Sequence, residues 1–323
     1  MNYFSVFTGV GGFELGLQYA NLSITKRNQQ RRNKADCSKS IGKQVGAQQF
    51  TCVGFSEIDK YASAVLKYQF PKIQNYGDIT KINWPTIPDF DLLVGGSPCQ
   101  DFSVAGKRAG LVGARSGLFG QYISALQFKK PKYFIWENVK GVLSSNGGKD
   151  FARIIHEMAE AGYALWWQVL NAKDFGVPQN RERIFVVGFR DQCPRKVFFE
   201  TGTSPSRVRE VPAKTLRAHA GGFSEYDTYV RCPLRYLDRN QKNIEGDYAY
   251  TVDASQTAGV MNDKVVRRLT PVECERLMSW PDDWTKHGDF DGEVKEISDS
   301  QRYRMCGNGV VSEVVKNLIK LIQ

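Results

Sequence analysis

The stretch Phe90-Asp91-Leu92-Leu93-Val94-Gly95-Gly96-Ser97-Pro98-Cys99-Gln100 is the part of this chain that best indicates its fold and the place of its chemistry. The apolar residues that end at Val94 are typical of a short buried strand, and the glycines after them mark the turn that leaves it. Cys99 therefore stands at the mouth of a strand, where a reactive thiol is expected. A lone cysteine is more often a small buried hydrophobic residue, so the role of Cys99 depends on its neighbours.

Similar apolar runs alternate with helical stretches over the first 190 residues, which predicts an α/β fold with a parallel sheet. The expected strands are Phe4–Phe7, Thr51–Phe55, Phe90–Val94, Tyr133–Trp136 and Ile184–Phe189, and the expected helices are Gly11–Tyr19, Tyr61–Tyr68, Leu118–Phe128 and Phe151–Glu160. After Arg190, prolines and mixed charges predict a smaller, irregular domain. Order returns where Thr270 can cap a helix, with Pro271 in its first turn and Glu273 reaching back. A last helix is expected from Val310 to Leu321.

The composition excludes several classes of protein. The chain has 323 residues, of which 41% are hydrophobic, enough for one large domain or two unequal ones. Seven cysteines without a Cys-x-x-Cys pair, together with three histidines, argue against a disulfide scaffold or a zinc site and fit a reducing compartment. No apolar run approaches the ~18 residues that a membrane span needs. We therefore expect a cytoplasmic protein without a metal ion or a membrane contact.

The net charge of +10 suits a polyanionic partner. Much of the excess lies between Ser23 and Phe50, a stretch that contains seven basic residues and a single acid, Asp36. This stretch is polar enough to be a mobile surface insertion. Two interpretations stay open for it: a solvated loop, or an auxiliary contact to nucleic-acid phosphates.

Polar residues follow several of the expected strands, at the sheet edge where α/β proteins bind ligands. The glycine turn Phe7–Phe13 follows the first strand, and Glu57 and Asp59 follow the second. A carboxylate in this place can bind the ribose of an adenosine-containing cofactor, although a surface pair of acids is an alternative. Glu137 follows the strand next to the one that leads to Cys99. The side chains of Gln179, Arg181 and Arg183 would point the same way in an extended segment.

In this order the motifs resemble those of the cytosine-specific DNA methyltransferases that form 5-methylcytosine, of prokaryotic or phage type. The resemblance covers nearly the whole chain and rests on ordered segments: Phe7-Thr8-Gly9-Val10-Gly11-Gly12, Ser56-Glu57-Ile58-Asp59, Gly77-Asp78-Ile79, Ser97-Pro98-Cys99-Gln100 with Phe102-Ser103, Arg115-Ser116-Gly117-Leu118-Phe119, Glu137-Asn138-Val139, Gln179-Asn180-Arg181-Glu182-Arg183, Arg268-Leu269-Thr270-Pro271 to Trp280-Pro281, and Gly307-Asn308-Gly309-Val310.

The resemblance implies a Rossmann-like α/β domain that binds S-adenosylmethionine, with a smaller target-recognition domain. It places the catalytic domain at 1–190 with the basic insertion 23–50, the target-recognition domain at 191–289, and a returning segment at 290–323. The substrate is expected to be a cytosine rotated out of double-stranded DNA. We expect a monomer of the bacterial cytoplasm or nucleoid, of the kind found in restriction-modification.

The resemblance also implies roles for individual residues. Cys99 is the nucleophile, Glu137 the acid at the ring nitrogen, and Arg183 with Arg181 the group that holds the ring carbonyl. The implied cofactor residues are Phe7, Gly9, Gly11, Gly12, Glu57, Ile58, Asp78, Ile79, Pro98, Leu118 and Asn308. The implied DNA-binding residues are Gln100, Ser103, Lys107, Arg108, Thr215, Arg217 and Thr251. The first four of these belong to a glycine-rich lid, and the others to two Thr-plus-aliphatic segments between which the sequence does not choose.

The chain departs from the family pattern at two cofactor positions. Ile58 replaces the aromatic residue often found between the two acids, and Gly309 replaces the usual Ser or Ala, which we expect to be tolerated. Three alternative functions remain: an RNA cytosine methyltransferase, a DNA-binding relative without activity, and a nucleotide-dependent oxidoreductase. The intact Cys99, Glu137 and Arg183 argue against the inactive relative, and the size of the recognition insert argues for DNA over RNA. An oxidoreductase would leave Pro98-Cys99-Gln100 and Gln179-Arg181-Arg183 unexplained.

Overall fold

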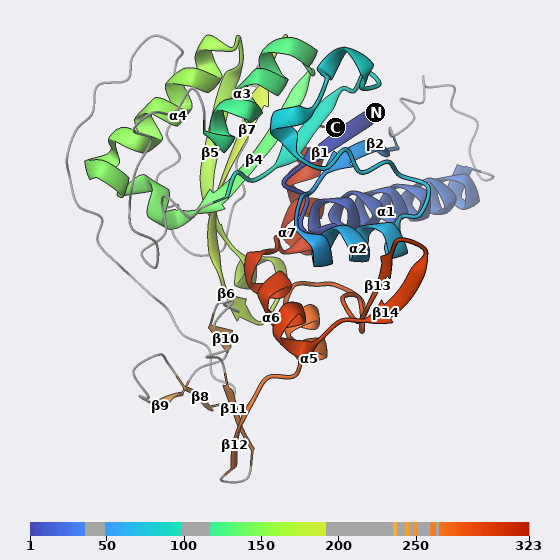
Figure 1. Ribbon diagram of the computed structural model, residues 1–323, viewed down its shortest axis with the longest axis vertical. Helices are drawn as coiled ribbons and strands as arrows, with labels where there is room; N and C mark the ends of the chain where they lie inside the picture. Colours follow the sequence, from blue (N-terminus) through green and yellow to red (C-terminus); the bar gives the residue numbers. More distant parts are fainter. Residues whose placement is uncertain are drawn as a thin grey trace.

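A six-stranded sheet forms the centre of the molecule (Figure 1). The computed structural model describes residues 1–35, 49–98, 117–191, 235–237, 243–245, 249–250, 259–262 and 265–322. In spatial order the strands are β2 (Thr51–Ser56), β1 (Asn2–Val6), β3 (Leu92–Gly95), β4 (Tyr133–Val139), β7 (Glu182–Phe189) and β5 (Ala164–Asn171). The first four run parallel, whereas β7 is antiparallel to both β4 and β5. The α/β prediction is confirmed, but the sheet is mixed and not parallel as expected. The sequence could not show this, because an apolar strand pattern carries no information on strand direction.

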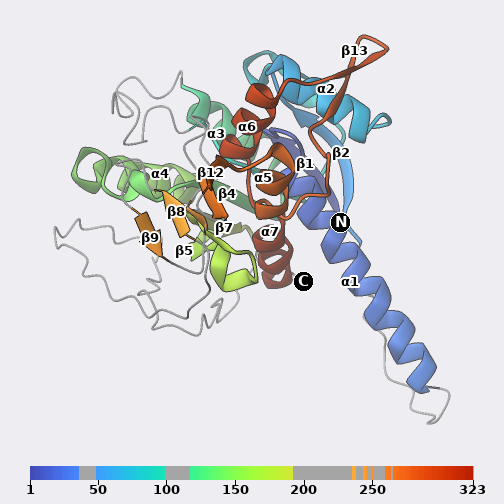
Figure 2. The same ribbon diagram turned by 90° about the horizontal axis from the view of Figure 1, so that it is seen from below.

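Helices cover both faces of this sheet (Figures 1 and 2). Helices α3 (Leu118–Lys129) and α4 (Lys149–Glu160) lie on one face, and α1 (Gly12–Ala35) and α7 (Ser312–Leu318) on the other. Successive side chains of a strand point to opposite faces, so in β1 Tyr3 enters the core on the α1 side while Phe4 and Val6 enter the core on the α3 side. Helix α2 (Lys60–Gln69) begins at Asp59, whose carboxylate accepts the amide hydrogens of Tyr61 and Ala62.

The C-terminal segment, from Leu269 onward, returns to this core. Helix α5 (Pro271–Leu277) has the expected capping box between Thr270 and Glu273. The hairpin of β13 (His287–Phe290) and β14 (Glu293–Glu296) packs on α2, and α6 (Asp299–Asn308) follows. Residues Leu269 to Trp284 include six that are buried in the same core as β1 and α1. This segment therefore packs with the large domain, although the sequence grouped it with the target-recognition domain.

Short elements complete the described structure. Strand β6 (Gln179–Asn180) pairs with β10 (Ala249–Tyr250). A four-stranded sheet contains β12 (Val265–Arg268), β11 (Gly259–Asn262), β8 (Arg235–Leu237) and β9 (Asn243–Glu245). The 3-10 helices are Ile79–Lys81, Trp84–Thr86, Lys140–Leu143, Ser145–Gly148, Ala172–Phe175 and Ile319–Leu321.

Several elements differ from the prediction. Helix α1 continues to Ala35, so the first part of the basic insertion is helical, and its far end projects from the body of the molecule in Figure 2. Strand β5 and helix α6 were missed, the latter because its sequence is mostly polar. The expected last helix is divided into α7 and a 3-10 turn. Over the described ranges, none of the helices is both long and apolar enough to span a membrane.

Candidate active site

Glu137 and Arg183 form an ion pair where β4 and β7 lie side by side. Arg183 pairs with Val139, two residues beyond Glu137, so both side chains leave the sheet on the same face. The distance from Arg183 Nε to Glu137 Oε1 is 3.1 Å, and both side chains are largely buried. The two residues that the sequence placed in one site are thus in direct contact.

Burial raises the pKa of Glu137, and the positive charges of Arg183 and Arg181 oppose this shift. A carboxyl with a raised pKa keeps its proton closer to neutral pH, as a general acid must. The same carboxyl lies against Gly96: a Cβ on Gly96 would be only 2.8 Å from Glu137 Oε2 and 2.6 Å from the Glu137 carbonyl oxygen. Only a residue without a side chain fits between β3 and this acid.

The loop that leads to Cys99 is anchored on β4. Trp136 donates from its indole nitrogen to Ser97 Oγ over 3.3 Å, and Asn138 Nδ2 donates to the Ser97 carbonyl oxygen over 3.2 Å. Pro98 is exposed at the end of this anchored segment. Cys99 itself lies outside the described residues. It is only two residues beyond Ser97, whose position is fixed by these hydrogen bonds, and three beyond Gly96, which lies against Glu137.

Glu57 closes the glycine turn after β1. Its carboxylate accepts the Gly9 amide hydrogen at 2.7 Å and the Asp59 amide hydrogen at 2.7 Å. Burial raises the pKa of Glu57, and these hydrogen bonds oppose the shift. Gly9 has φ +60° and Phe7, directly before the turn, has φ +53°, which is uncommon for a residue with a side chain. Such backbone strain is typical of functional sites.

The third cofactor segment lies beside the second. Ser56 Oγ donates to the Gly77 carbonyl oxygen over 2.6 Å. The next residue, Asp78, caps the 3-10 helix at 79–81, and hydrogen bonds from Thr80 lower the pKa of its carboxyl. Ile58 is 73% exposed, whereas Ile79 is 4% exposed and packs in the core. Of these two expected cofactor residues, only Ile58 has a side chain that is free to contact a ligand.

Arg181 requires a correction. It was expected to help hold the ring carbonyl, but it is 2% exposed and its guanidinium donates to the carbonyl oxygens of Gly307 and Gly309, at 2.9 and 2.7 Å. Gln179 likewise donates to the Leu277 carbonyl oxygen. The expected alternation does not extend to Arg183, because Arg181 lies between β6 and β7 and belongs to neither strand. Arg181 therefore positions the turn that carries Asn308.

The residues present fit S-adenosylmethionine. The space beside Gly9 is open, since a Cβ there would meet no atom within 4 Å, and carboxylates suited to ribose hydroxyls stand at the same strand ends. Asn308 and Leu118 are exposed at the ends of their helices. Gly11 and Gly12 complete the turn, where a Cβ on either would lie within 2.8 Å of a neighbouring side chain or carbonyl oxygen.

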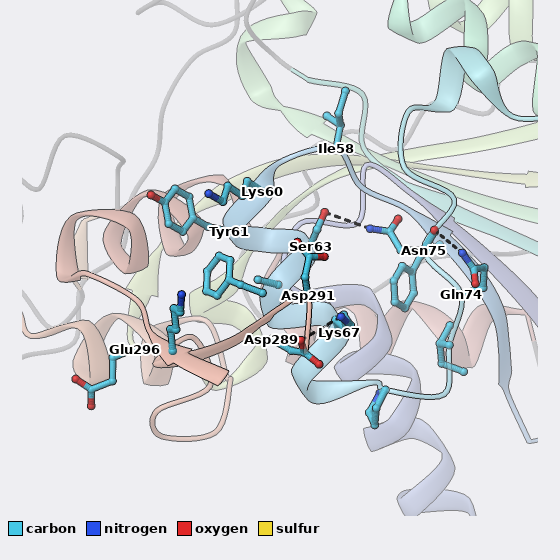
Figure 3. A pocket seen from close by; sticks show the side chains of 16 residues that line it. Ile58, Lys60, Tyr61, Ser63, Lys67, Gln74, Asn75, Asp289, Asp291 and Glu296 are labelled. Carbon is cyan, nitrogen blue, oxygen red and sulfur yellow. Dashed lines mark hydrogen bonds and ion pairs between the residues drawn. The ribbon is translucent and has the colours of Figure 1, made fainter. Parts of the chain in front are cut away.

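A separate hollow of about 850 Å³ lies on the outer side of α2. It is bordered by α2, residues 71–75 and the β13–β14 hairpin, and its charges are mixed. Figure 3 shows Ile58 at one end of it, apart from the other labelled side chains, and the ion pair of Lys67 with Asp289 in the lower half of the view. Only Ile58 belongs both to this hollow and to the expected cofactor residues.

Long-range contacts in this region had no signal in the sequence. Arg304 forms an ion pair of 2.6 Å with Asp59, beside the cofactor acids. Trp284 Nε1 donates to the Val10 carbonyl oxygen and Ser312 Oγ to the Gly12 carbonyl oxygen, each over 2.8 Å. These partners lie more than 200 residues apart, so no local pattern predicts them. The expected DNA-binding residues Gln100, Ser103, Lys107, Arg108, Thr215, Arg217 and Thr251 lie outside the described residues.

Comparisons with known proteins give a consistent result. The profile of C-5 cytosine-specific DNA methylases matches residues 1–219 and 227–323. The chain is 41% identical over 189 residues to the orphan methyltransferase M.Rho11sI of Bacillus phage rho11s, covering 58% of this chain but only 32% of that relative. It is 32% identical to the type II methyltransferase M.NgoBI of Neisseria gonorrhoeae, covering 87% of this chain and 89% of the relative. The crystal structure of S. pombe Dnmt2 methyltransferase has the same fold, with a TM-score of 0.63, 16% identity, and coverage of 100% and 98%.

Proposed function

The chain belongs to the C-5 cytosine-specific DNA methylase family, and from this premise we propose that it methylates carbon 5 of cytosine in a specific sequence of double-stranded DNA. The observation that carries the proposal is the buried pair of Glu137 and Arg183 beside Gly96, at the root of the loop that contains Cys99. A thiol, a carboxyl with a raised pKa and a guanidinium are the groups that this chemistry requires.

Carbon 5 of cytosine is too electron-poor to attack a methyl donor, so carbon 6 must first accept a nucleophile. In the proposed mechanism the Cys99 thiolate forms a bond to carbon 6 while Glu137 gives its proton to the ring nitrogen beside the amino group. Arg183 holds the ring carbonyl oxygen and stabilises the charge that develops. Loss of the proton from carbon 5 later restores the ring and expels the Cys99 sulfur.

S-adenosylmethionine, the methyl donor of this family, supplies an electrophilic methyl group on its sulfonium. The residues proposed to hold it are Glu57 at the ribose, Asp78 at the adenine amino group, and the turns at Gly9 and Asn308 at the methionine part. Ile58 supplies an apolar surface for the adenine, in place of the usual aromatic residue.

We propose that residues 192–268 form the target-recognition domain, a narrower range than the sequence indicated, because 269–284 pack in the large core. Strand β10 ends at Tyr250, which pairs with Asn180 of β6, three residues before Arg183. Thr251 follows Tyr250 directly in the sequence. This link favours the segment with Thr251 over the one with Thr215 as the DNA reader.

The test is tritium transfer from labelled S-adenosylmethionine to duplex DNA and, separately, to transfer RNA, followed by bisulfite sequencing of DNA from cells that express the protein. We expect label in DNA only, at one sequence. Cys99→Ser should reduce transfer to background yet bind the cofactor normally. Cys52→Ser is the matched control, because the thiol of Cys52 lies on β2 and burial raises its pKa to about 12.

Trapping gives an independent readout of the covalent step. Duplex DNA with 5-fluorocytosine at the modified position cannot lose a proton from carbon 5, so it should stay bonded to Cys99 in the presence of the donor. Label in transfer RNA alone, or full activity of Cys99→Ser, would contradict the proposal.

A further inference from the structure

The indole ring of Trp280 lies between the two turns proposed to bind the cofactor. Its Nε1 is 3.5 Å from the position that a Cβ on Gly12 would take, and its Cζ2 and Cη2 are 2.5 Å from the position of a Cβ on Gly309. Trp280 is 3% exposed. The ring thus contacts both the glycine turn and the turn that carries Asn308, and the two turns also meet directly, because the Val310 carbonyl oxygen is 2.7 Å from the same position at Gly12.

Gly309 is one of the two cofactor positions at which this chain departs from the family pattern; the usual residue here is Ser or Ala. A separation of 2.5 Å is shorter than any real Cβ contact, and the Met305 carbonyl oxygen lies 3.2 Å away on the other side. An alanine at 309 would therefore have to displace either the indole or the turn. The absent side chain of Gly309 and the large ring of Trp280 are complementary.

The backbone gives the ring little freedom to move. Ser279, directly before Trp280, has φ +59°, and its carbonyl oxygen accepts a hydrogen bond of 3.0 Å from Tyr19 of α1. The Trp280 amide donates to the Glu275 carbonyl oxygen at 2.9 Å, and the Ser312 amide to that of Met278 at 3.1 Å. Strain of this kind persists where the surroundings fix the conformation.

The indole is not placed there to satisfy its own hydrogen bond. Its buried Nε1 has no acceptor within the described part of the chain, whereas Trp284, four residues later, donates to the Val10 carbonyl oxygen. An unpaired buried donor is unfavourable and rare. The tryptophan therefore contributes through the shape and packing of its ring and not through a hydrogen bond.

We propose that Trp280 is a positioning residue for cofactor binding, whose ring fills the space left by Gly309 and fixes the turn that carries Asn308 relative to the glycine turn. This inference rests on the cofactor site assigned in the proposed function. It makes Trp280 and Gly309 a coupled pair: changing one should be harmful, and changing both in the compensating sense should be tolerated. Phenylalanine lacks the second ring whose atoms approach Gly309, so Trp280→Phe makes room for a Cβ there.

The experiment is a double-mutant cycle on the full chain with Gly309→Ala, Trp280→Phe and the double variant. The affinity for S-adenosylhomocysteine is measured by calorimetry without DNA, and KM for the methyl donor and kcat are measured with DNA. We expect Gly309→Ala to weaken binding by about tenfold or more. The double variant should bind within about threefold of the wild type. In Gly309→Ala the increase in KM should exceed the decrease in kcat.

Trp166→Phe is the matched control, because Trp166 is a buried tryptophan on β5 and its substitution should leave cofactor affinity unchanged. If the two substitutions act independently, or if Gly309→Ala binds normally, the inference is wrong. If Gly309→Ala does not fold, a double variant that folds and binds supports the inference, and one that fails overturns it. Because binding is measured without DNA, failure of the proposed substrate is detected separately from failure of this pair.

Discussion

At the scale of single residues, the pair of Glu137 and Arg183 connects structure to reactivity. Burial raises the pKa of Glu137, and the guanidinium of Arg183 lowers it. The protonated fraction of Glu137, and with it the acid step, should therefore decline as pH rises through that pKa. Glu137→Gln cannot titrate, so it should lose this falling limb and react about 10²-fold to 10⁴-fold more slowly.

Arg183→Met tests how far the guanidinium of Arg183 lowers the pKa of Glu137. Without the positive charge that favours the carboxylate, the pKa of Glu137 rises further, so the falling limb should move to higher pH while the maximal rate decreases. The measurement is the pH dependence of single-turnover methyl transfer at saturating cofactor. A limb that moves to lower pH, or that persists in Glu137→Gln, would assign the titration to another group.

At the scale of elements, the turn between α6 and α7 depends on Arg181. Its guanidinium holds the Gly307 and Gly309 carbonyl oxygens from the junction of β6 and β7. Arg181→Met leaves these buried oxygens without that donor, so the free energy of unfolding should fall by about 3 kcal/mol, and cofactor affinity should fall with it. Urea denaturation and calorimetry measure the two effects.

Two controls separate this role from catalysis. Arg153→Met removes an ion pair on the surface of α4 and should change stability by less than about 1 kcal/mol. Arg183→Met should retain cofactor affinity and lose rate. If Arg181→Met kept its affinity for the cofactor and lost only rate, Arg181 would act on the ring carbonyl of the target cytosine, as the resemblance implied.

The same elements show how far the sequence could predict the structure. Strands β1, β2, β3, β4 and β7 and the cap of α5 were predicted because local periodicity and capping residues encode them. The reversed direction of β7 and the anchoring of the Cys99 loop by Trp136 and Asn138 were not, because they depend on partners distant in sequence. Glu137 was found from its place after a strand. The role expected for Arg181 came from the resemblance, and the contacts of its guanidinium with the Gly307 and Gly309 carbonyl oxygens are encoded by no local pattern.

At the scale of the whole molecule, a buried acid makes stability depend on pH. Glu14, in the first turn of α1, is fully buried, and the described ranges give its carboxyl no ion-pair partner; only weak hydrogen bonds from Ser5 and from its own backbone oppose the effect of burial. Burial raises its pKa to about 7. The nearby titratable groups are Tyr3 of β1 and Cys52 of β2; burial raises the pKa of each well above neutrality, so both stay uncharged beside Glu14.

A folded-state pKa above the unfolded one means that the fold prefers protonated Glu14. Its contribution is complete below the unfolded pKa near 4.5 and is lost as pH rises through about 7. Between pH 4.5 and pH 8 this single group should therefore reduce the free energy of unfolding by on the order of 3 kcal/mol. Glu14→Gln should flatten that dependence in urea denaturation, whereas Glu160→Gln on the exposed end of α4 should not. Equal slopes for Glu14→Gln and the wild type would mean that Glu14 is ionised in the folded protein, and that a partner for its charge exists beneath the glycine turn.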